Sequence, residues 1–289
     1  MPVERSTAGS SRTGGQSHGR GRQRGGAQGN RSQRGRGGGG RGRGGRRGGT
    51  RPVDVPYSPP TYPPAATLNL YATNDPGLQT KLSQPGIKRI RFGDDFQIED
   101  SHLQTMSAIP GLMNTLEVLS LGDSDTGNGA YLTDAGVQLF LSQSPHLISL
   151  TLDACTRLKN ATLIHALESC PRLQHLRITG NDKVKGGITD AVFKTLRERA
   201  DLGTNLKELV LYDQSVDPFR KDFKAFSKAR KELTIREGET LGDGIADNMI
   251  AAMTGGSSLS AWKGGKMVGM DVDMGIYGPG GYDMPFYDF

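Results

Sequence analysis

Arginine and glycine dominate the first 51 residues of the chain. This segment holds thirteen arginines and eighteen glycines against one acidic residue, Glu4. Each guanidinium is a permanent cation with fork-shaped donors, and glycine gives the backbone that carries it great freedom. Such a segment can follow phosphates and stack on bases without one fixed shape, so it predicts contact with RNA. The arginines that we expect to bind RNA are Arg20, Arg24, Arg34, Arg36, Arg41, Arg43, Arg46 and Arg47.

Four of these arginines, Arg24, Arg36, Arg43 and Arg47, each open an Arg-Gly-Gly triplet. In this respect the segment resembles the RGG boxes of RNA-binding proteins, and the resemblance implies that its arginines are substrates for methylation. The resemblance covers residues 1–51 only. A solubilising or nucleolar-targeting tail is the alternative interpretation.

Side chains that could support catalysis or bind a metal are scarce. The chain has five histidines and two cysteines, and none of them has the spacing of a metal-binding or nucleophilic motif. His165 falls on the apolar face of an expected helix and is predicted to be a packed side chain. Cys155 and Cys170 are expected to be reduced thiols in small buried positions. We therefore predict no enzymatic activity, no cofactor, no metal and no small-molecule substrate.

Charge divides the chain into a basic arm and an acidic remainder. The first 51 residues contain 13 of the 36 basic residues and one of the 30 acidic residues, so they carry +12 and the remaining 238 residues carry −6. This distribution predicts one nucleic-acid contact region and not a basic folded face. The N-terminus has no apolar stretch typical of a secretory signal, and no run is long enough to span a bilayer. We expect a nuclear or cytoplasmic protein that is not secreted and does not contact a membrane.

A leucine-rich pattern recurs five times in the middle of the chain. Each copy has apolar residues at its first, fourth and sixth positions, and an apolar-periodic helix follows each of the first four copies. Polar turns predict the starts of these helices at 98–100, 132–134, 157–160 and 188–190. The copies are IKRIRF from Ile87, LEVLSL from Leu116, LISLTL from Leu147, LQHLRI from Leu173 and LKELVL from Leu206. Strand, turn and helix at this period predict an α/β fold: a short leucine-rich-repeat solenoid with parallel strands on its concave face and helices on its convex face.

The third copy shows the pattern most clearly. It reads L-x-x-L-x-L-x-x-C-x-x-L from Leu147 to Leu158, and Cys170-Pro171 precedes the next copy. It resembles the cysteine-containing, ribonuclease-inhibitor-like leucine-rich repeats of F-box/LRR proteins and of the budding-yeast mitotic-exit antagonist family. The resemblance covers residues 87–236, but the second and fourth copies carry insertions. Ligand positions are therefore not transferred from the family.

Composition divides the chain into four predicted segments. These are a disordered Arg/Gly-rich tail at 1–51, a proline-rich linker at 52–86, the leucine-rich-repeat domain at 87–236, and a Gly/Met/Asp-rich, largely disordered tail at 237–289. Tyr57 and Tyr62 stand beside prolines and could form a proline-recognition ligand, but a stiff spacer is the interpretation we favour. A helix that starts at Asp217-Pro218 and a strand at 233–235 are expected to cap the repeats.

Residues between the large apolar positions of each strand should face the concave side, because side chains alternate across a strand. In neighbouring copies these residues align in columns that mix basic, polar and acidic groups. Such a mixture fits a peptide or protein partner better than a nucleic-acid duplex, which would favour one positive field. The residues expected to bind this partner are Arg89, Arg91, His175, Arg177, Glu208 and Tyr212. A solvated face without a partner is the alternative.

The function predicted from the sequence is a non-enzymatic adaptor that binds a protein through the concave face and RNA through the arm. A substrate receptor of an SCF-type ubiquitin ligase is one alternative, suggested by the F-box/LRR resemblance. That function requires an F-box, and residues 52–86 hold no amphipathic helix long enough for one. A condensate-forming protein is the other alternative, in which the arginines contact the aromatic, acidic C-terminal tail.

Overall fold

The computed structural model describes residues 56–73, 75–93, 95–123, 126–181, 183–240 and 259–271, without the side chains of residues 270 and 271. All of these residues belong to one compact unit, Thr50–Phe289. The arginines predicted to bind RNA lie outside the described residues.

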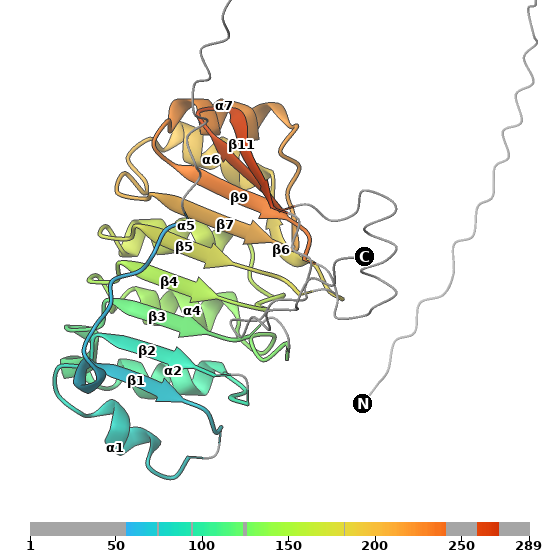
Figure 1. Ribbon diagram of the computed structural model, residues 1–289. Coiled ribbons are helices and arrows are strands. Elements are labelled where there is room, and N and C mark those ends of the chain that lie inside the picture. Colours follow the sequence, from blue (N-terminus) through green and yellow to red (C-terminus); the bar gives the residue numbers. More distant parts are fainter. Residues whose placement is uncertain are drawn as a thin grey trace, which may run out of the picture. The chain divides into compact units, whose positions relative to one another are not determined.

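A nine-stranded sheet forms the centre of this unit (Figure 1). The strands are β1 Thr67–Leu70, β2 Arg89–Phe92, β3 Val118–Leu121, β4 Ser149–Leu152, β5 His175–Ile178, β7 Glu208–Tyr212, β9 Thr234–Gly238, β10 Leu259–Lys263 and β11 Lys266–Asp271. They lie side by side in this order, and every pair from β1 to β9 is parallel. Strand β10 pairs antiparallel with both β9 and β11. A separate small sheet pairs β6 Gly186–Thr189 with β8 Gln214–Ser215.

Each leucine-rich copy supplies one strand, which confirms the five predicted strands. The fourth and sixth residues of a copy point to the same side of the sheet. In β4 these are Leu150 and Leu152, which are fully buried, whereas Thr151 between them is partly exposed. The period of the apolar residues therefore fixes which side of each strand joins the core.

The helices lie on one side of the sheet, as Figure 1 shows for α2, α4, α5 and α6. Their bounds are α2 Asp100–Ser107, α3 Pro110–Met113, α4 Asp134–Leu141, α5 Asn160–Ser169, α6 Ala191–Glu198 and α7 Lys221–Ala229. In α4, for example, Val137, Phe140 and Leu141 are buried in the same apolar core as the strand leucines. The chain therefore has a mixed α/β fold with a mostly parallel sheet.

A ladder of polar side chains joins successive strand–helix units. At each junction a side-chain oxygen near the start of one helix accepts a hydrogen bond from a backbone N–H that precedes the next helix. The acceptors Asp100, Asp134, Asn160 and Asp190 bond the N–H groups of Thr133, Lys159, Thr189 and Asp217 at 3.0, 2.9, 2.8 and 2.8 Å. The polar turns predicted to start the helices therefore also tie each unit to its neighbour.

The predicted linker at 52–86 contains elements of the fold, which corrects the boundary at residue 87. Strand β1 pairs parallel with β2, and α1 Leu78–Leu82 follows it. Leu70 and Leu82 are buried in the main core. No proline lies between Pro64 and Pro76, and the alternating leucines Leu68 and Leu70 form a strand there because a neighbouring strand can pair with them.

The predicted tail at 237–289 also supplies strands to the sheet, which corrects its boundary. A hairpin joins β10 to β11 through Gly264 and Gly265, whose φ angles are +59° and +76°. Glycine tolerates these angles, and two such residues are typical of tight hairpins. Trp262 is 5% exposed and packs edge-on against Phe223 of α7, with ring centroids 5.6 Å apart.

Helix α7 and strand β9 close the parallel part of the sheet. Strand β9 pairs with β7 and contains most of the strand predicted at 233–235. Helix α7 begins at Lys221 with Arg220 as its N-cap residue, and not at Asp217-Pro218 as predicted. The N–H of Asp217 instead bonds Asp190 and so continues the polar ladder.

Candidate functional site

The side of the sheet opposite the helices, which we call the open face, carries the outward strand residues in register. The amino-end column consists of Arg89, Val118, Ser149, His175 and Glu208. The middle column consists of Arg91, Ser120, Thr151, Arg177 and Val210. Pairing in the sheet therefore aligns these residues as the sequence predicted.

Most of the amino-end column is covered, although it points away from the helices. Val118, Ser149, His175 and Glu208 are 3%, 2%, 9% and 4% exposed. His175 and Glu208 were expected to lie on an accessible surface, so this expectation is wrong for both. Their burial requires a covering layer on the open face.

Part of that layer is the proline–tyrosine segment, residues 56–63 (PYSPPTYP). Figure 1 shows it running from β1 along the amino ends of the strands toward β5 and β7. The ring of Tyr57 stacks on the His175 imidazole, with centroids 5.2 Å apart and planes 11° apart. The backbone N–H of Tyr57 lies 3.5 Å from Oε1 of Glu208. The segment that was predicted to be a stiff spacer is therefore packed on the sheet.

A second tyrosine anchors the other end of the proline–tyrosine segment. The Tyr62 hydroxyl donates a hydrogen bond of 2.6 Å to Oε2 of Glu117, just before β3. Lys88, just before β2, contacts the other oxygen of this carboxylate at 2.9 Å, and its ammonium lies 5.7 Å from the centre of the Tyr62 ring. Burial and the hydrogen bond to Glu117 raise the pKa of Tyr62, so its hydroxyl stays protonated.

His175 is a neutral group at the centre of the covered column. Burial, and then the charge of Arg177, lower its pKa to about 4. Nε2 of His175 lies 3.4 Å from a Glu208 oxygen, and Nδ1 lies 3.1 Å from Oγ of Ser149. Because a carboxylate can only accept, the proton belongs on Nε2, and Nδ1 accepts from Ser149. Glu208 is also paired with Arg236 of β9, whose Nε lies 2.7 Å away.

The middle column is more accessible and carries its own charge pair. Arg91 is exposed, whereas Arg177 is partly covered and bonds Asp153 through Nε at 2.6 Å. The guanidinium carbon of Arg177 lies 5.4 Å from the centre of the Tyr212 ring. Tyr212 is only 8% exposed and packs with Val210, so it too departs from the expected accessible surface.

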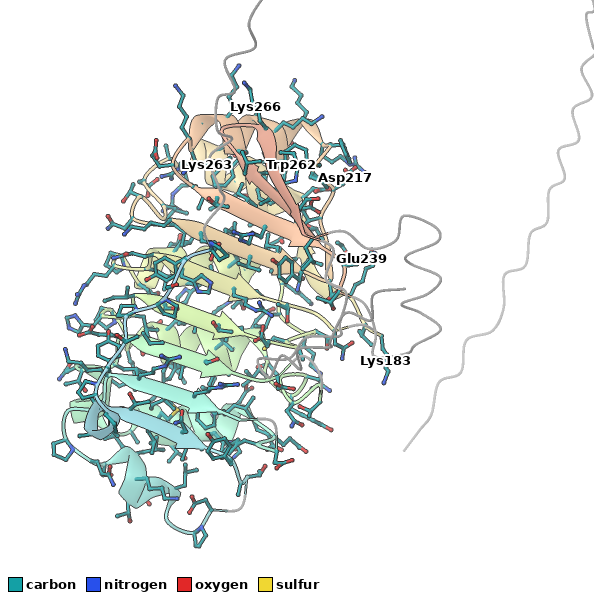
Figure 2. All side chains as sticks on the ribbon, in the orientation of Figure 1. Lys183, Asp217, Glu239, Trp262, Lys263 and Lys266 are labelled. Atoms are coloured by element: carbon teal, nitrogen blue, oxygen red, sulfur yellow. The ribbon has the colours of Figure 1, made fainter. Side chains whose placement is uncertain are left out.

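A cavity of about 360 Å³ opens beside Tyr57 at the end of the amino-end column. It is lined by Tyr57, Lys207, Glu208, Glu232, Thr234 and Lys263. Figure 2 shows Lys263 at this end of the sheet. Its two lysines and two glutamates give it no single charge, so it favours a polar segment over a small anion.

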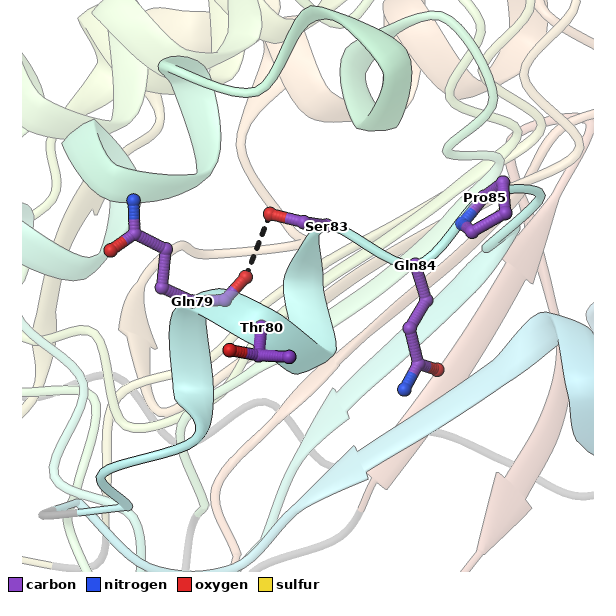
Figure 3. Close-up of a pocket in the computed structure, with 5 residues that line it drawn as sticks. All are labelled: Gln79, Thr80, Ser83, Gln84 and Pro85. Atoms are coloured by element: carbon purple, nitrogen blue, oxygen red, sulfur yellow. Dashed lines mark hydrogen bonds between the residues drawn. The ribbon is translucent and has the colours of Figure 1, made fainter.

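A larger depression, about 560 Å³, lies beside α1 and is lined by Gln79, Thr80, Ser83, Gln84 and Pro85 (Figure 3). Oγ of Ser83 donates to the Gln79 carbonyl at 2.8 Å, which is a contact within the helical turn. The side chains that line it include neither a charged group nor a nucleophile with a partner base. The depression therefore has no chemistry that would mark it as a site.

The cysteines are unsuited to nucleophilic chemistry. Both are free and buried. Burial raises the pKa of Cys170 to about 12 and that of Cys155 well above its ordinary value, so both thiols stay protonated. Within the described ranges, no three His, Cys, Asp or Glu side chains group in a way that could hold a metal ion. No helix in the described part of the chain combines the length and apolar character needed to cross a membrane.

No protein-family model matches the chain, and no curated protein matches its sequence. Lys88 and Glu117 were not identified from the sequence, whereas Tyr57 and Tyr62 were considered as a proline-recognition ligand and then interpreted as part of a spacer. The prolines beside the two tyrosines were the available signal. That signal predicted an extended segment correctly but could not indicate that the segment lies on the sheet.

Proposed function

We propose that the chain is a non-enzymatic adaptor, in which a short leucine-rich-repeat solenoid binds a protein partner on the open face and the arginine–glycine arm binds RNA. The parallel sheet in chain order and the polar ladder between units support the solenoid. Helices lie on one side of the sheet, and on the other side the middle column is partly accessible.

The observation that supports protein binding is that an extended segment of the chain itself packs on the open face. Residues 56–63 contact side chains from the amino ends of β2, β3, β5 and β7. These contacts use rings, carboxylates and an ammonium group, and so they are of the kind that one protein makes with another. Beside this segment, the middle column still offers Arg91, Ser120 and Thr151 to a partner.

The ubiquitin-ligase alternative gains no support from the residues before β2. In the described part of this region, β1 joins the sheet and α1 spans five residues. Leu70 and Leu82 from these elements are buried in the core of the repeats. These elements belong to the same sheet and core as the leucine-rich copies and do not resemble a separate three-helix module.

The middle column provides the test of this function. A photoreactive residue placed at Thr151 of the full chain should crosslink to the partner in cells, which can then be identified and purified. We expect the double variant Arg91→Glu, Ser120→Glu to bind that purified partner at least about tenfold more weakly, because a charge reversal at an interface costs at least about 1.4 kcal/mol.

Lys194→Glu is the matched control, because Lys194 is exposed on α6, among the helices. Its affinity should equal that of the wild type, and both variants should keep the wild-type melting temperature. A partner that binds the double variant as tightly as the wild type would show that the open face is not its binding surface.

A further inference from the structure

We propose that the amino-end column, together with Lys88 and Glu117, is a binding site for extended peptides with two proline-flanked tyrosines, and that residues 56–63 occupy this site in cis. The inference rests on the proposed function and names the class of peptide that the open face accepts. A protein partner with such a sequence would bind by replacing the chain's own segment.

The site consists of two separate tyrosine anchors. At the first anchor, Tyr62 is held by Glu117 and lies against Lys88. At the second, the Tyr57 ring lies flat on the neutral imidazole of His175. The first anchor recognises a hydroxyl and the second a flat ring, and tyrosine provides both groups.

The spacing of the anchors matches the spacing of the tyrosines. Strands lie about 4.8 Å apart, so the three intervals from β2/β3 to β5/β7 span about 14 Å. Five residues of polyproline II rise about 15 Å. Pro59 and Pro60 lie between the tyrosines and favour this conformation. An extended peptide can therefore cross the ends of the strands and fill both anchors without a bend.

Proline also explains why side chains carry most of the recognition. Residues 56, 59, 60 and 63 are prolines and have no N–H to donate. The N–H of Tyr57, aimed at Glu208, is the one hydrogen bond that the structure shows from this backbone segment to the column. A peptide without the tyrosines would therefore retain little of the contact.

The first anchor discriminates between forms of tyrosine. The Glu117 carboxylate can only accept, so it favours a protonated hydroxyl and leaves a phenylalanine without this bond. A phosphotyrosine has no hydroxyl proton to donate at this position and would bring further negative charge against Glu117, whose carboxylate is already paired with Lys88. The site should therefore prefer unmodified tyrosine.

Because the chain's own segment occupies the site, a peptide from another protein must displace it in order to bind. Tyr62 is five residues from the start of β1, so the segment stays close to its own site. The effective concentration of such a short tether is of the order of millimolar, and a free peptide must compete with it. Removing the two tyrosines should open the site while leaving the receptor side chains in place.

A labelled synthetic peptide with the sequence of residues 55–65 (VPYSPPTYPPA) tests the proposal by fluorescence anisotropy. The receptors are the wild-type full chain and the full-length variant Tyr57→Ser, Tyr62→Ser. We expect the variant to bind the peptide at least about tenfold more tightly than the wild type, because its site is no longer occupied.

Adding Glu117→Ala and His175→Ala to the variant should abolish binding. Peptides with both tyrosines changed to phenylalanine, or with Tyr62 phosphorylated, should bind at least about fivefold more weakly.

The proposal would be overturned if the folded variant Tyr57→Ser, Tyr62→Ser did not bind the peptide at about 1 mM, which is comparable with the effective concentration of the tethered segment. Equal binding to the wild type and the variant would overturn it as well. If the double variant lost its cooperative melting transition, Tyr62→Phe would allow the same comparison with a single hydroxyl removed. A failed peptide experiment together with intact partner binding through the middle column would reject this inference and leave the proposed function standing.

Discussion

The charge of His175 depends on a residue that is 118 positions earlier in the chain. Tyr57 covers the imidazole, and the burial lowers the pKa of His175 from 6.5 to about 4. The unfolded chain therefore binds this proton more tightly than the folded chain does. The stability associated with neutral His175 is present above about pH 6.5 and is lost as the pH falls toward 4.

Tyr57→Ala should raise the pKa of His175 toward 6.5, because the imidazole would regain water. Nuclear magnetic resonance titration of the histidine ring protons measures this directly. Tyr71→Ala is the control, since Tyr71 is 63% exposed and should leave the titration unchanged. An unchanged pKa in Tyr57→Ala would mean that the proline–tyrosine segment does not cover this column in solution.

Leu150→Ala or Leu176→Ala should lower the free energy of unfolding by about 2–5 kcal/mol, because each leaves a cavity in a packed core. Both leucines are 0% exposed. Denaturant unfolding monitored by circular dichroism provides the measurement. Thr151→Ala, one residue along β4 and on the open face, should change the free energy by less than about 0.5 kcal/mol. Similar losses at 150 and 151 would contradict the register.

At the scale of elements, the units are joined by side chains as well as by the sheet. Oδ1 of Asp134 accepts from the Lys159 N–H at 2.9 Å and also bonds the Thr162 hydroxyl. One carboxylate at the start of α4 therefore fixes the start of α5. The contact recurs along the chain, so the starts of successive helices, each of eight to ten residues, are tied to one another.

Asp134→Ala should cost about 1–3 kcal/mol of unfolding free energy, because it removes the acceptor for two donors between units. Asp134→Asn keeps an oxygen acceptor and should cost less. Asp222→Ala is the comparison, since its bond to Arg197 lies on the surface and should be worth less than about 1 kcal/mol. Equal effects of Asp134→Ala and Asp222→Ala would show that the ladder does not stabilise the fold.

At the scale of the whole molecule, the chain combines opposite charges. The first 51 residues carry +12 and the rest of the chain carries −6. The open face carries both signs, since Glu117, Asp153 and Glu208 on or beside its columns are paired with Lys88, Arg177 and Arg236. We therefore propose electrostatic recognition for the arm and recognition through side-chain contacts for the open face.

Binding of single-stranded RNA should weaken steeply with salt, because phosphate contacts release counterions and carry no base information. Serine at Arg20, Arg24, Arg34, Arg36, Arg41, Arg43, Arg46 and Arg47 of the full chain should remove most of this affinity and flatten its salt dependence. Lysine at the same positions is the control, since it keeps the charge and should keep the slope. Wild-type affinity in the serine variant, measured by filter binding, would contradict the assignment of the arm.

The sequence by itself determined the five strands of the leucine-rich copies, the helices that follow the first four of them and the alignment of the columns. These features are local: Leu150 and Leu152 point inward because their spacing matches the period of a strand, whatever lies elsewhere. The arginine–glycine composition of the arm can likewise be recognised from the sequence alone, and the binding of RNA by the arm stays a prediction.

Only the tertiary structure decided which outward residues are covered. His175 and Glu208 have the spacing of exposed positions, but Tyr57 packs on them from outside their own strands. Strand β1 and the hairpin around Gly264 and Gly265 form for a related reason, because four to six residues become a strand when a neighbouring edge can pair with them. Burial by a distant segment is a property of the folded chain, since it depends on contacts between residues that no local period relates.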